Sequence, residues 1–306
     1  MYAYAIEDRP GRDSSPEPDV TIVVGAAASE TALVRCLAAL EPQRDRAEVV
    51  VLEAQPGSEA VHNRFPWAEF HLRSGALVPE LWRDGIARAR GRIVALTIAQ
   101  MIPAPDWVDA IIRAHQDHDA VGGAIDPGEG LRAADWAEYF CRYSRDMAPF
   151  APNDHEELAS DNASYRRALL LEEWEYLRDG FWEPVIHPAL RRRGARLWHT
   201  PALLVFMGRS SGFSAFARQR SKHGHLYAYQ RGPEFTRARH ALGVAASPAV
   251  PFLMTARVLR RVFAKRRFRA RAIAVLPLVF VLYAVWAIAE ARGHFELLVR
   301  VRQPCG

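Results

Sequence analysis

Short runs of apolar, mostly β-branched residues alternate with segments of helical periodicity in the first part of the chain. Runs without polar alternation are typical of strands buried on both faces, as in a parallel sheet covered by helices. Ser29 and Glu30 are suited to cap the helix that follows the first strand. The pattern therefore predicts an α/β fold with a Rossmann-like, doubly wound, mainly parallel sheet. The predicted strands are 20–24, 48–53, 70–72, 91–97 and 120–125, and two further helices are predicted at 79–90 and 106–118.

The pattern changes after Asp126, where we expect less sheet and more irregular structure. An aromatic segment is followed by a polar loop, the segment Asn162-Ala-Ser-Tyr-Arg-Arg, and a helix over 183–193. The aromatic residues are expected in the core instead of on a sugar-stacking surface; they are Trp136, Tyr139, Phe140 and Tyr143. The predicted organisation is a disordered tail (1–19), one domain (20–240) with halves 20–126 and 127–240, and a C-terminal segment (241–306).

The C-terminal segment contains an uncharged run of 18 residues, 272–289, close to the roughly 20 that span a bilayer. Eight basic residues lie among the fifteen of 257–271, directly before it. Basic flanks mark the cytoplasmic side of a membrane segment, and Tyr283 and Trp286 suit an interface. We therefore favour membrane-associated helices over a buried core helix, with both spanning and interfacial arrangements open.

Charge is distributed unevenly along the 306 residues, although the net charge is only +5. The segment 191–271 holds 19 Arg and Lys against one acidic residue, Glu234. Such a segment points to nucleic acid, anionic lipid or a phosphorylated ligand. The three cysteines are widely spaced, which excludes a disulfide scaffold and a cysteine zinc cluster.

Several common functional motifs are absent. Gly25 is followed by alanines, so the dinucleotide-binding glycines are missing, and no Walker loop, nucleophile elbow or His-Glu-x-x-His occurs. The basic segment lacks the pattern of a helix-turn-helix, so nucleic acid is not an expected partner. One polar cluster could suggest a metal site but ends an amphipathic helix, where exposed polar residues are expected; it contains His115, Asp117, His118 and Asp119.

Segments from Val20 to Phe295 resemble, in order, the family 2 glycosyltransferases of the GT-A fold. The run 84–96 is similar to the family's "N-x-G-x-x-x-A-x-G-x-x-I-x-x-L" stretch, with Asp84 in place of Asn. The segment starting at Asn162 resembles its "N-x-A-x-R-R" acceptor-side turn. An apolar helix after a basic run is also common in membrane-bound members. The other matching segments are 20–24, 48–58, 103–108 and 121–123.

The resemblance implies a nucleotide-diphospho-sugar donor bound by residues 20–126 and an acceptor bound by 127–240. Glu183 lies eleven residues before Gly194, the spacing of the family's general base, although a carboxylate in the first turn of a helix also has a structural explanation. The implied donor-side residues are Gly25, Glu53 (at the position that contacts the base), Asp84, Thr97 and Gln100. The implied acceptor-side or phosphate-side residues are Asn162, Arg166, Arg167, Arg220 and His223.

The resemblance also implies a divalent cation, Mg2+ or Mn2+, held by an Asp-x-Asp motif that neutralises the departing diphosphate. At that position the chain reads Thr97-Ile-Ala-Gln100, with no carboxylate from Thr97 to Ala104. Two neutral oxygen ligands would hold a metal weakly. Arg220, His223 and His225 offer another means of stabilising a diphosphate.

Two functional hypotheses follow. The first is an inverting, inner-membrane glycosyltransferase facing the cytoplasm, acting on a glycan or lipid-linked acceptor in cell-envelope or exopolysaccharide assembly, with anionic lipids as partners. The second is a catalytically inactive relative that binds nucleotide-sugar or lipid as a scaffold. The spacing of Glu183 favours the enzyme, and the missing acidic motif favours the scaffold.

Overall fold

A nine-stranded sheet forms the centre of the structure, a computed structural model that describes residues 18–27, 29–210, 212–231 and 235–300. Its strand order is β3-β2-β1-β4-β8-β6-β9-β5, with β7 pairing beside β9. The strands are β1 (Val20–Ala26), β2 (Ala47–Glu53), β3 (Glu69–Leu72), β4 (Ile93–Ile98), β5 (Met101–Pro103), β6 (Ala120–Pro127), β7 (Asn153–His155), β8 (Asn162–Arg166) and β9 (Leu197–Met207).

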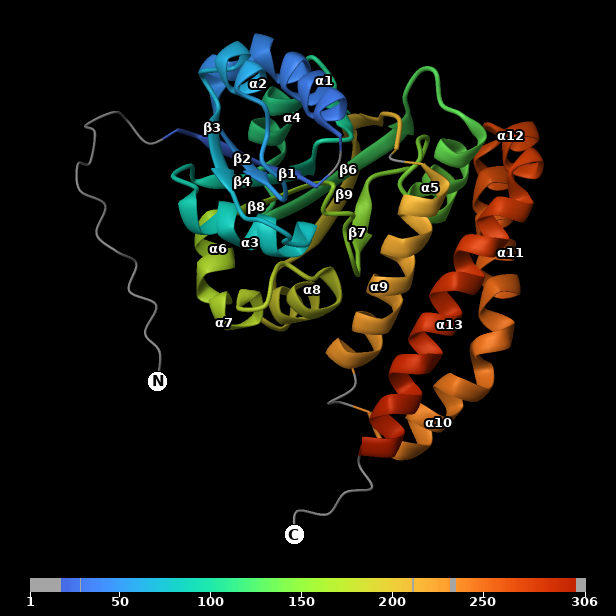
Figure 1. The fold of residues 1–306 in the computed structure, drawn as a ribbon. Coiled ribbons are helices and arrows are strands. Elements are labelled where there is room, and N and C mark those ends of the chain that lie inside the picture. Colours follow the sequence, from blue (N-terminus) through green and yellow to red (C-terminus); the bar gives the residue numbers. More distant parts are fainter. Residues whose placement is uncertain (1–17, 28, 211, 232–234, 301–306) are drawn as a thin grey trace.

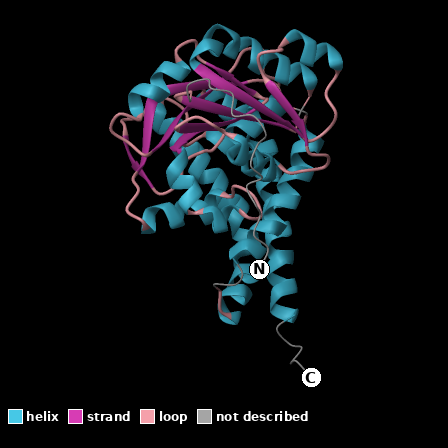
Figure 2. Ribbon diagram, turned by 90° about the vertical axis from the view of Figure 1, so that its left-hand side faces the viewer, coloured by secondary structure: helices cyan, strands magenta, loops and turns pink. Residues whose placement is uncertain are grey.

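Helices cover both sides of the sheet, and a separate layer of helices extends from one end of it (Figures 1 and 2). The helices α1, α2 and α4 lie on one side, and α3, α6, α7 and α8 lie on the other (Figure 1). The helices are α1 (Glu30–Leu40), α2 (Glu59–Arg64), α3 (Val78–Arg88), α4 (Trp107–Ala114), α5 (Ala133–Tyr143), α6 (Arg167–Glu172), α7 (Trp174–Leu177), α8 (Glu183–Arg192), α9 (Phe213–Arg231), α10 (Arg237–Ala246), α11 (Val250–Lys265), α12 (Arg269–Ala274) and α13 (Leu276–Arg300), with short 3-10 helices η1 (Glu41–Arg46) and η3 (Ser247–Ala249).

The predicted α/β class and mainly parallel sheet are confirmed. Strands β3, β2, β1 and β4 are parallel to one another, and so are β6 and β9. Ordered sheet begins at Val20 as expected, and the Ser29 side chain caps α1 by accepting a hydrogen bond from Ala32 N. Of the predicted tail 1–19, residues 1–17 lie outside the described residues.

The second half of the domain contributes more to the sheet than the sequence suggested. The segment starting at Asn162, expected as a turn, is strand β8, which is antiparallel to both β4 and β6. The eleven-residue strand β9 was not predicted from the sequence, and Pro201 lies within it. A register shift between Gly123 and Ala124 of β6 accommodates this irregularity.

Two glycines of the family-like stretch 84–96 have a packing role. A Cβ on Gly85 would lie 2.1 Å from Val23 Cγ1, and one on Gly91 would lie 2.5 Å from Thr21 N. Gly91 N also donates to Thr21 Oγ1 at 2.8 Å. These glycines therefore let α3 and the start of β4 approach β1 closely.

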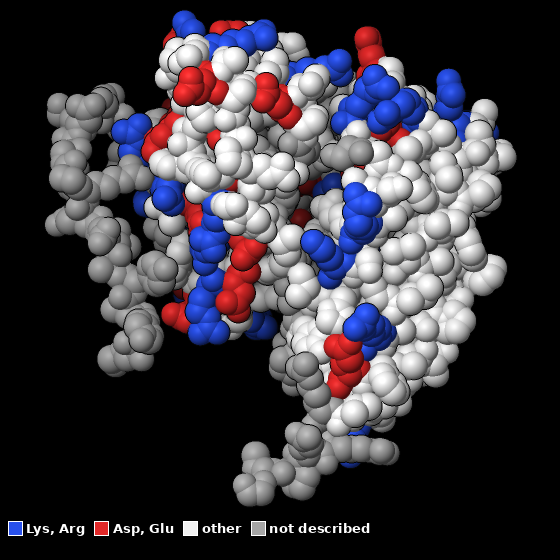
Figure 3. Space-filling model, viewed as in Figure 1, with Lys and Arg blue, Asp and Glu red and all other residues white. Residues whose placement is uncertain are grey.

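The C-terminal helices form a layer with an apolar outer surface. Helix α13 packs along α9, α10 and α11. Among the described residues, nine of the eleven large apolar side chains that are exposed belong to α10–α13. Figure 3 shows this surface almost free of charged side chains, which lie along its borders. The exposed apolar side chains of the layer are Leu242, Phe252, Leu253, Phe263, Ile273, Val281, Ile288, Phe295 and Val299.

Two helical stretches in this layer, Arg237–Lys265 and Leu276–Val299, are long and apolar enough to cross a membrane. Only 17% and 33% of their apolar windows are buried inside the protein, which differs from the core helix of a soluble protein.

Two residues of the basic run 257–271 also contact the sheet domain. Lys265 Nζ donates to the carbonyl oxygens of Arg145 and Met147. Arg267 pairs with Asp126 at 3.0 Å and donates to the Ala148 carbonyl at 2.6 Å. These two side chains fasten the junction of α11 and α12 to the sheet domain, so part of the basic run is engaged by the protein itself.

Candidate functional site

A cavity of about 960 Å3 lies between the carboxyl ends of the parallel strands and the C-terminal helical layer. Residues that follow β1, β2 and β4 line one side, α5 and the start of α8 line the middle, and α9, α11 and α13 line the far side. In open α/β sheets this edge is where ligands bind. The volume is at the upper end of the range for ligand pockets, roughly 300–1,000 Å3.

Glu183 lies in this cavity as the first residue of α8, directly before Pro184. Proline is favoured in the first turn of a helix, so the local sequence fixes where α8 starts and where the carboxylate stands. Burial, followed by the nearby charge of Glu157, raises the pKa of Glu183 to about 7. A carboxylate with such a pKa is suited to accept a proton near neutral pH.

A buried network lies beside Glu183. The Arg142 guanidinium of α5 donates to Asp161 Oδ2 at 2.7 Å, and Tyr143 OH donates to the same oxygen at 2.7 Å. Arg142 also pairs with Glu138 at 3.4 Å. Burial alone would lower the pKa of Arg142, but the charge of Asp161, with those of its other neighbours, outweighs burial. The pKa is therefore raised overall, and the guanidinium stays charged.

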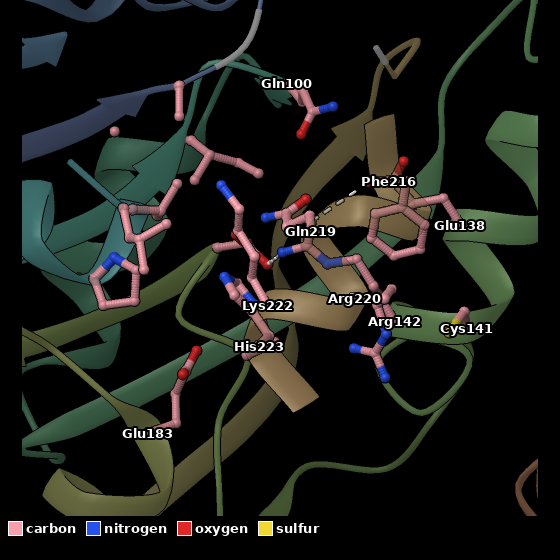
Figure 4. Close-up of a pocket in the computed structure, with 18 of the residues that line it drawn as sticks. Gln100, Glu138, Cys141, Arg142, Glu183, Phe216, Gln219, Arg220, Lys222 and His223 are labelled. Carbon is pink, nitrogen blue, oxygen red and sulfur yellow. Dashed lines mark hydrogen bonds and ion pairs between the residues drawn. The ribbon is translucent and has the colours of Figure 1, made fainter. Parts of the chain in front are cut away.

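Helix α9 supplies a second group of cations to the cavity. Figure 4 shows Lys222, Arg220 and Gln219 of α9 projecting between Gln100 on one side and Glu183 on the other. Among the described residues, no carboxylate lies within ion-pair distance of Arg218, Arg220 or Lys222. This side of the cavity therefore carries uncompensated positive charge.

Two side chains of α9 are held by aromatic contacts. The Arg220 guanidinium lies 3.9 Å from the centre of the Trp286 ring of α13. His223 meets Trp182 edge to face, with ring centres 5.7 Å apart. Burial and the charge of Arg142 lower the pKa of His223 to about 4, so this imidazole is neutral at pH 7 and can donate or accept but adds no positive charge.

Some of the residues predicted from the sequence meet in this cavity, and others do not. The predicted site residues that line the cavity are Gly25, Gln100, Glu183, Arg220 and His223. Glu53, Asp84, Thr97, Asn162, Arg166 and Arg167 do not line it. Gly25, one of the lining residues, lies near the end of β1. A Cβ added there would lie 3.4 Å from the side chains of Trp82 and Val78.

The remaining donor-side residues make contacts within the protein. The Glu53 carboxylate is buried and lies 3.0 Å from His62 Nε2. Asp84 pairs with Arg73 at 2.7 Å and with Arg83. The Thr97 hydroxyl is buried and donates to the Asp161 carbonyl at 3.0 Å.

The remaining acceptor-side residues belong to β8 and its surroundings. The Asn162 amide is fully buried, accepts from Trp107 Nε1, and donates to the carbonyls of Ala124 and Leu203. Arg166 pairs with Asp119 at 2.7 Å and donates to the carbonyl of residue 115. Arg167 starts α6, outside the cavity. Asn162 and Arg166 therefore stabilise the sheet and its neighbouring loop.

The side chains at the expected Asp-x-Asp position, Thr97 to Gln100, do not form a metal site in the described part of the chain. No group of three or more His, Cys, Asp or Glu residues in the described part of the chain is arranged to hold a metal ion. The Thr97 hydroxyl donates to the Asp161 carbonyl and does not reach the cavity. Gln100 does line the cavity. The polar residues near 115–119 were expected to be exposed, but this is wrong for His115, which is buried with its Nε2 2.9 Å from the Ser164 hydroxyl.

The sequence reasoning missed several residues of the cavity. Gln55 could have been found from its place two residues after Glu53, because side chains just beyond a strand reach the same sheet edge. The predicted aromatic core is confirmed for Trp136, Tyr139, Phe140 and Tyr143, but the network of Tyr143 was not foreseen. Residues from α5 and the loop after it, and from α9, α11 and α13, meet only through long-range packing, for which the sequence carries no local signal. They include Arg142, Arg145, Arg218, Lys222, Arg261 and Trp286.

Comparison with known proteins identifies the fold. The sequence matches no family model and no curated protein. Among solved structures, the chain is similar to the mannosyltransferase PcManGT from Pyrobaculum calidifontis in complex with GDP-Man and Mn2+. The TM-score is 0.52 and the sequence identity is 20%, over 95% of this chain and 91% of that chain. The chain has a glycosyltransferase fold.

The likeness covers nearly the whole chain, so it extends into the C-terminal helical layer as well as the sheet. The prediction of a glycosyltransferase fold followed by a helical segment is thereby confirmed. Membership of family 2 stays a prediction. In a glycosyltransferase fold, the cavity at the carboxyl ends of β1 and β4 is the natural place to look for chemistry.

Proposed function

We propose that the protein is a membrane-associated, inverting glycosyltransferase that uses a nucleotide-diphospho-sugar donor. The observation that carries the proposal is Glu183, a carboxylate with a pKa raised to about 7 inside a large cavity whose α9 wall holds cations that have no carboxylate partner among the described residues. A base and a site for negative charge are the two groups that sugar transfer from a diphosphate requires. The glycosyltransferase fold supports the same reaction class.

In this reaction Glu183 removes the proton from the acceptor hydroxyl as its oxygen bonds to the anomeric carbon of the sugar. The bond from that carbon to the diphosphate oxygen breaks on the opposite face, and the nucleoside diphosphate leaves with the electron pair. The anomeric configuration is inverted. The negative charge that develops on the leaving group would be stabilised by Arg218, Arg220 and Lys222 of α9.

The donor nucleoside would lie against the loops after β1, β2 and β3. Gly25, Gln55 and Ser74 line that end of the cavity. The sequence reasoning gave the base contact to Glu53, whose carboxylate faces His62. We propose that Gln55, beside it, makes the contact instead.

We propose that transfer proceeds without a protein-bound divalent cation. The similar mannosyltransferase was solved with Mn2+, but this chain has Thr97 and Gln100 where the family places its acidic motif, and the described residues contain no group of three or more His, Cys, Asp or Glu side chains arranged to hold a metal ion. The cations of α9 would neutralise the diphosphate in place of a metal ion. Activity is therefore expected to persist in EDTA.

The proposed place of action is the inner membrane, with the sheet domain on the cytoplasmic side and a glycan or lipid-linked acceptor of envelope or exopolysaccharide assembly. The apolar surface of α10–α13 and two helices of membrane-spanning length support the membrane part of the proposal. Five exposed basic residues near α11 and α12 would contact anionic headgroups; they are Arg257, Arg260, Arg266, Arg269 and Arg271.

The direct test is the variant Glu183→Gln. It keeps the size of the side chain but cannot accept the proton. Sugar transfer from labelled nucleotide-sugars to a membrane lipid and glycan extract should fall about 100-fold or more, the usual contribution of a general base. Nucleotide binding should be retained. Unchanged turnover in this variant would remove Glu183 as the base.

A second candidate function is a catalytically inactive protein that binds nucleotide-sugar or lipid. The missing acidic motif at Thr97–Gln100 favours it. The two candidates differ in one measurement: the scaffold binds nucleotide but transfers no sugar from any nucleotide-sugar, whereas the enzyme transfers sugar and loses transfer in Glu183→Gln.

A further inference from the structure

A second, smaller cavity of about 250 Å3 lies beside the large one. Among the described residues that line them, the two cavities share only Ala99 and Gln100, so the segment after β4 separates them. Most of the remaining lining comes from the start of α1, the residue before α5 and the segment after β9. Neither Glu183 nor the cations of α9 line this cavity, so the proposed transfer reaction leaves it unexplained.

Three arginines from separate parts of the chain meet in this cavity, which we call the arginine pocket. Arg35 belongs to α1, Arg132 directly precedes α5, and Arg209 follows β9. The described residues that line the pocket include no Asp or Glu. In the described part of the chain, no carboxylate lies within ion-pair distance of Arg35 or Arg209. Both guanidinium groups therefore carry positive charge that no described carboxylate compensates.

The third arginine is held in place by a buried carboxylate. Asp135 is fully buried, and its Oδ2 accepts from Arg132 N at 2.8 Å and from Arg132 Nε at 3.1 Å. Its Oδ1 accepts from Ser210 N at 3.0 Å and from Ser210 Oγ at 2.8 Å. Asp135 thus fixes two lining residues that are far apart in the chain. Because its single charge offsets only one of the three arginines, the pocket stays positive.

The chemistry of the lining defines the ligand as a small anion. The pocket offers guanidinium groups and the hydroxyls of Ser29 and Thr31, without a carboxylate among the described lining residues. Guanidinium groups bind phosphate-like oxyanions through paired, charge-assisted hydrogen bonds. The volume lies below the roughly 300–1,000 Å3 of pockets for drug-sized ligands, which favours an inorganic ion over a nucleotide. Several arginines around one such pocket suit an ion with more than one negative charge.

We propose that the arginine pocket binds a small inorganic oxyanion of the phosphate class, with diphosphate preferred over phosphate, at a site separate from the sugar donor. The ion would link α1 to the segment 208–210, whose Gly208 N donates to the Gln100 carbonyl at 2.7 Å. It would brace these segments and would not react, because Glu183 lies outside the pocket. The inference goes beyond the proposed transferase function and does not rest on it.

The test is calorimetric titration of the purified full chain with inorganic diphosphate and with inorganic phosphate, in EDTA and at fixed ionic strength. Diphosphate should bind about tenfold more tightly, because it presents more charge and more oxygens to the arginines. The titration is repeated in Arg218→Gln/Lys222→Gln, which removes cations from the large cavity. There the affinity for diphosphate should agree with that of the wild type within about threefold.

The variant Arg35→Gln/Arg209→Gln should weaken diphosphate binding about tenfold or more and leave UDP and GDP binding unchanged. Both side chains are exposed, so the change should not disturb the fold. Arg35→Lys/Arg209→Lys, which keeps the charge, should restore part of the affinity.

The matched control is Arg44→Gln/Arg64→Gln, which removes the same charge from two exposed residues outside both cavities. It should bind diphosphate as the wild type does. Saturating diphosphate should raise the melting temperature of the wild type and of this control by about 3 °C or more, because it binds only the folded chain. The Arg35→Gln/Arg209→Gln variant should show little of this rise.

Three results would overturn the inference: no binding of diphosphate, an unchanged affinity in Arg35→Gln/Arg209→Gln, or an equal loss in the Arg44→Gln/Arg64→Gln control. Displacement of diphosphate by saturating UDP or GDP would also overturn it, since the ion would then occupy the donor's own diphosphate subsite. Absence of nucleotide binding in the same preparation would count against the proposed function and would leave the arginine pocket standing.

Discussion

The proposed chemistry depends on Glu183, because both its position and its environment suit a general base. It starts α8 at the wall of the cavity, and burial beside Glu157 raises its pKa to about 7. The family spacing of eleven residues to Gly194 located it in the sequence. Its raised pKa could not be read from that spacing, since Glu157 and the Arg142–Asp161 network approach it only in the fold.

The rate of sugar transfer should depend on pH through this carboxylate. The base is active when deprotonated, so kcat/KM should rise about tenfold per pH unit below pH 7 and level off above it. The measurement is kcat/KM for a fixed donor and acceptor from pH 5 to pH 9. A flat profile across pH 7 would mean that another group limits the reaction.

The same pKa shift predicts an effect on stability. The folded pKa of Glu183 lies above the ordinary value of 4.5, so the folded protein keeps a proton that the unfolded chain loses as pH rises from 4.5 to about 7. Stability is therefore lost over that window, and Glu183→Gln avoids the loss. At pH 8 the melting temperature of the variant should exceed that of the wild type by roughly 5–10 °C, because the pKa shift corresponds to roughly 3 kcal/mol.

At pH 4.5 the two melting temperatures should coincide, which serves as the internal control. A variant that is less stable than the wild type at pH 8 would show that ionised Glu183 is stabilised in the fold. That result would contradict the raised pKa.

At the scale of the elements, α9 lines the cavity, and the α11–α12 junction holds the helical layer to the sheet domain. The sequence predicted α1, α3, α4 and α8 because each carries its own apolar periodicity and start signals. It did not predict β8 and β9 as members of the central sheet, because their pairing joins residues far apart in the chain. For the same reason, the basic residues of α9 and α11 could be counted but not placed.

The cations of α9 should govern nucleotide affinity. The double variant Arg218→Gln/Lys222→Gln should weaken UDP or GDP binding about tenfold, because charge-assisted contacts to phosphate are lost. Isothermal titration calorimetry of the full chain measures this. Arg237→Gln on α10, exposed and outside the cavity, is the matched control. Equal affinities in the double variant and the control would place the diphosphate elsewhere.

The junction of α11 and α12 should be held to the sheet domain by Arg267. In Arg267→Gln the buried Asp126 loses its ion-pair partner, with a cost of about 1–3 kcal/mol. Thermal unfolding and limited proteolysis should both reveal a looser helical layer. Arg271→Gln, exposed on α12, should have no effect. Wild-type stability in Arg267→Gln would show that apolar packing alone fixes the junction.

At the scale of the whole molecule, the chain combines a glycosyltransferase sheet domain with an apolar helical layer that forms one wall of its cavity. The sequence predicted both parts, the first from its strand pattern and the second from the uncharged run 272–289. That the two parts share one cavity follows only from the packing of α13 along α9.

The apolar surface of the layer should determine membrane binding. The double variant Phe252→Asp/Leu253→Asp should reduce co-flotation with liposomes about tenfold or more, since charged side chains are costly in hydrocarbon. Both side chains are more than half exposed. Leu72→Asp is the matched control, because Leu72 is 55% exposed but lies on β3, at the far edge of the sheet. Equal loss in both variants would refute a specific membrane surface.

The most direct test of the central claim, a glycosyltransferase that works without a bound metal, is titration of the full chain with UDP and GDP in EDTA and in Mn2+. We predict that at least one of the two binds, with affinities in the two conditions that agree within about threefold. Binding that appears only with Mn2+ would contradict the role given to α9. Binding of neither nucleotide in either condition would contradict the transferase itself.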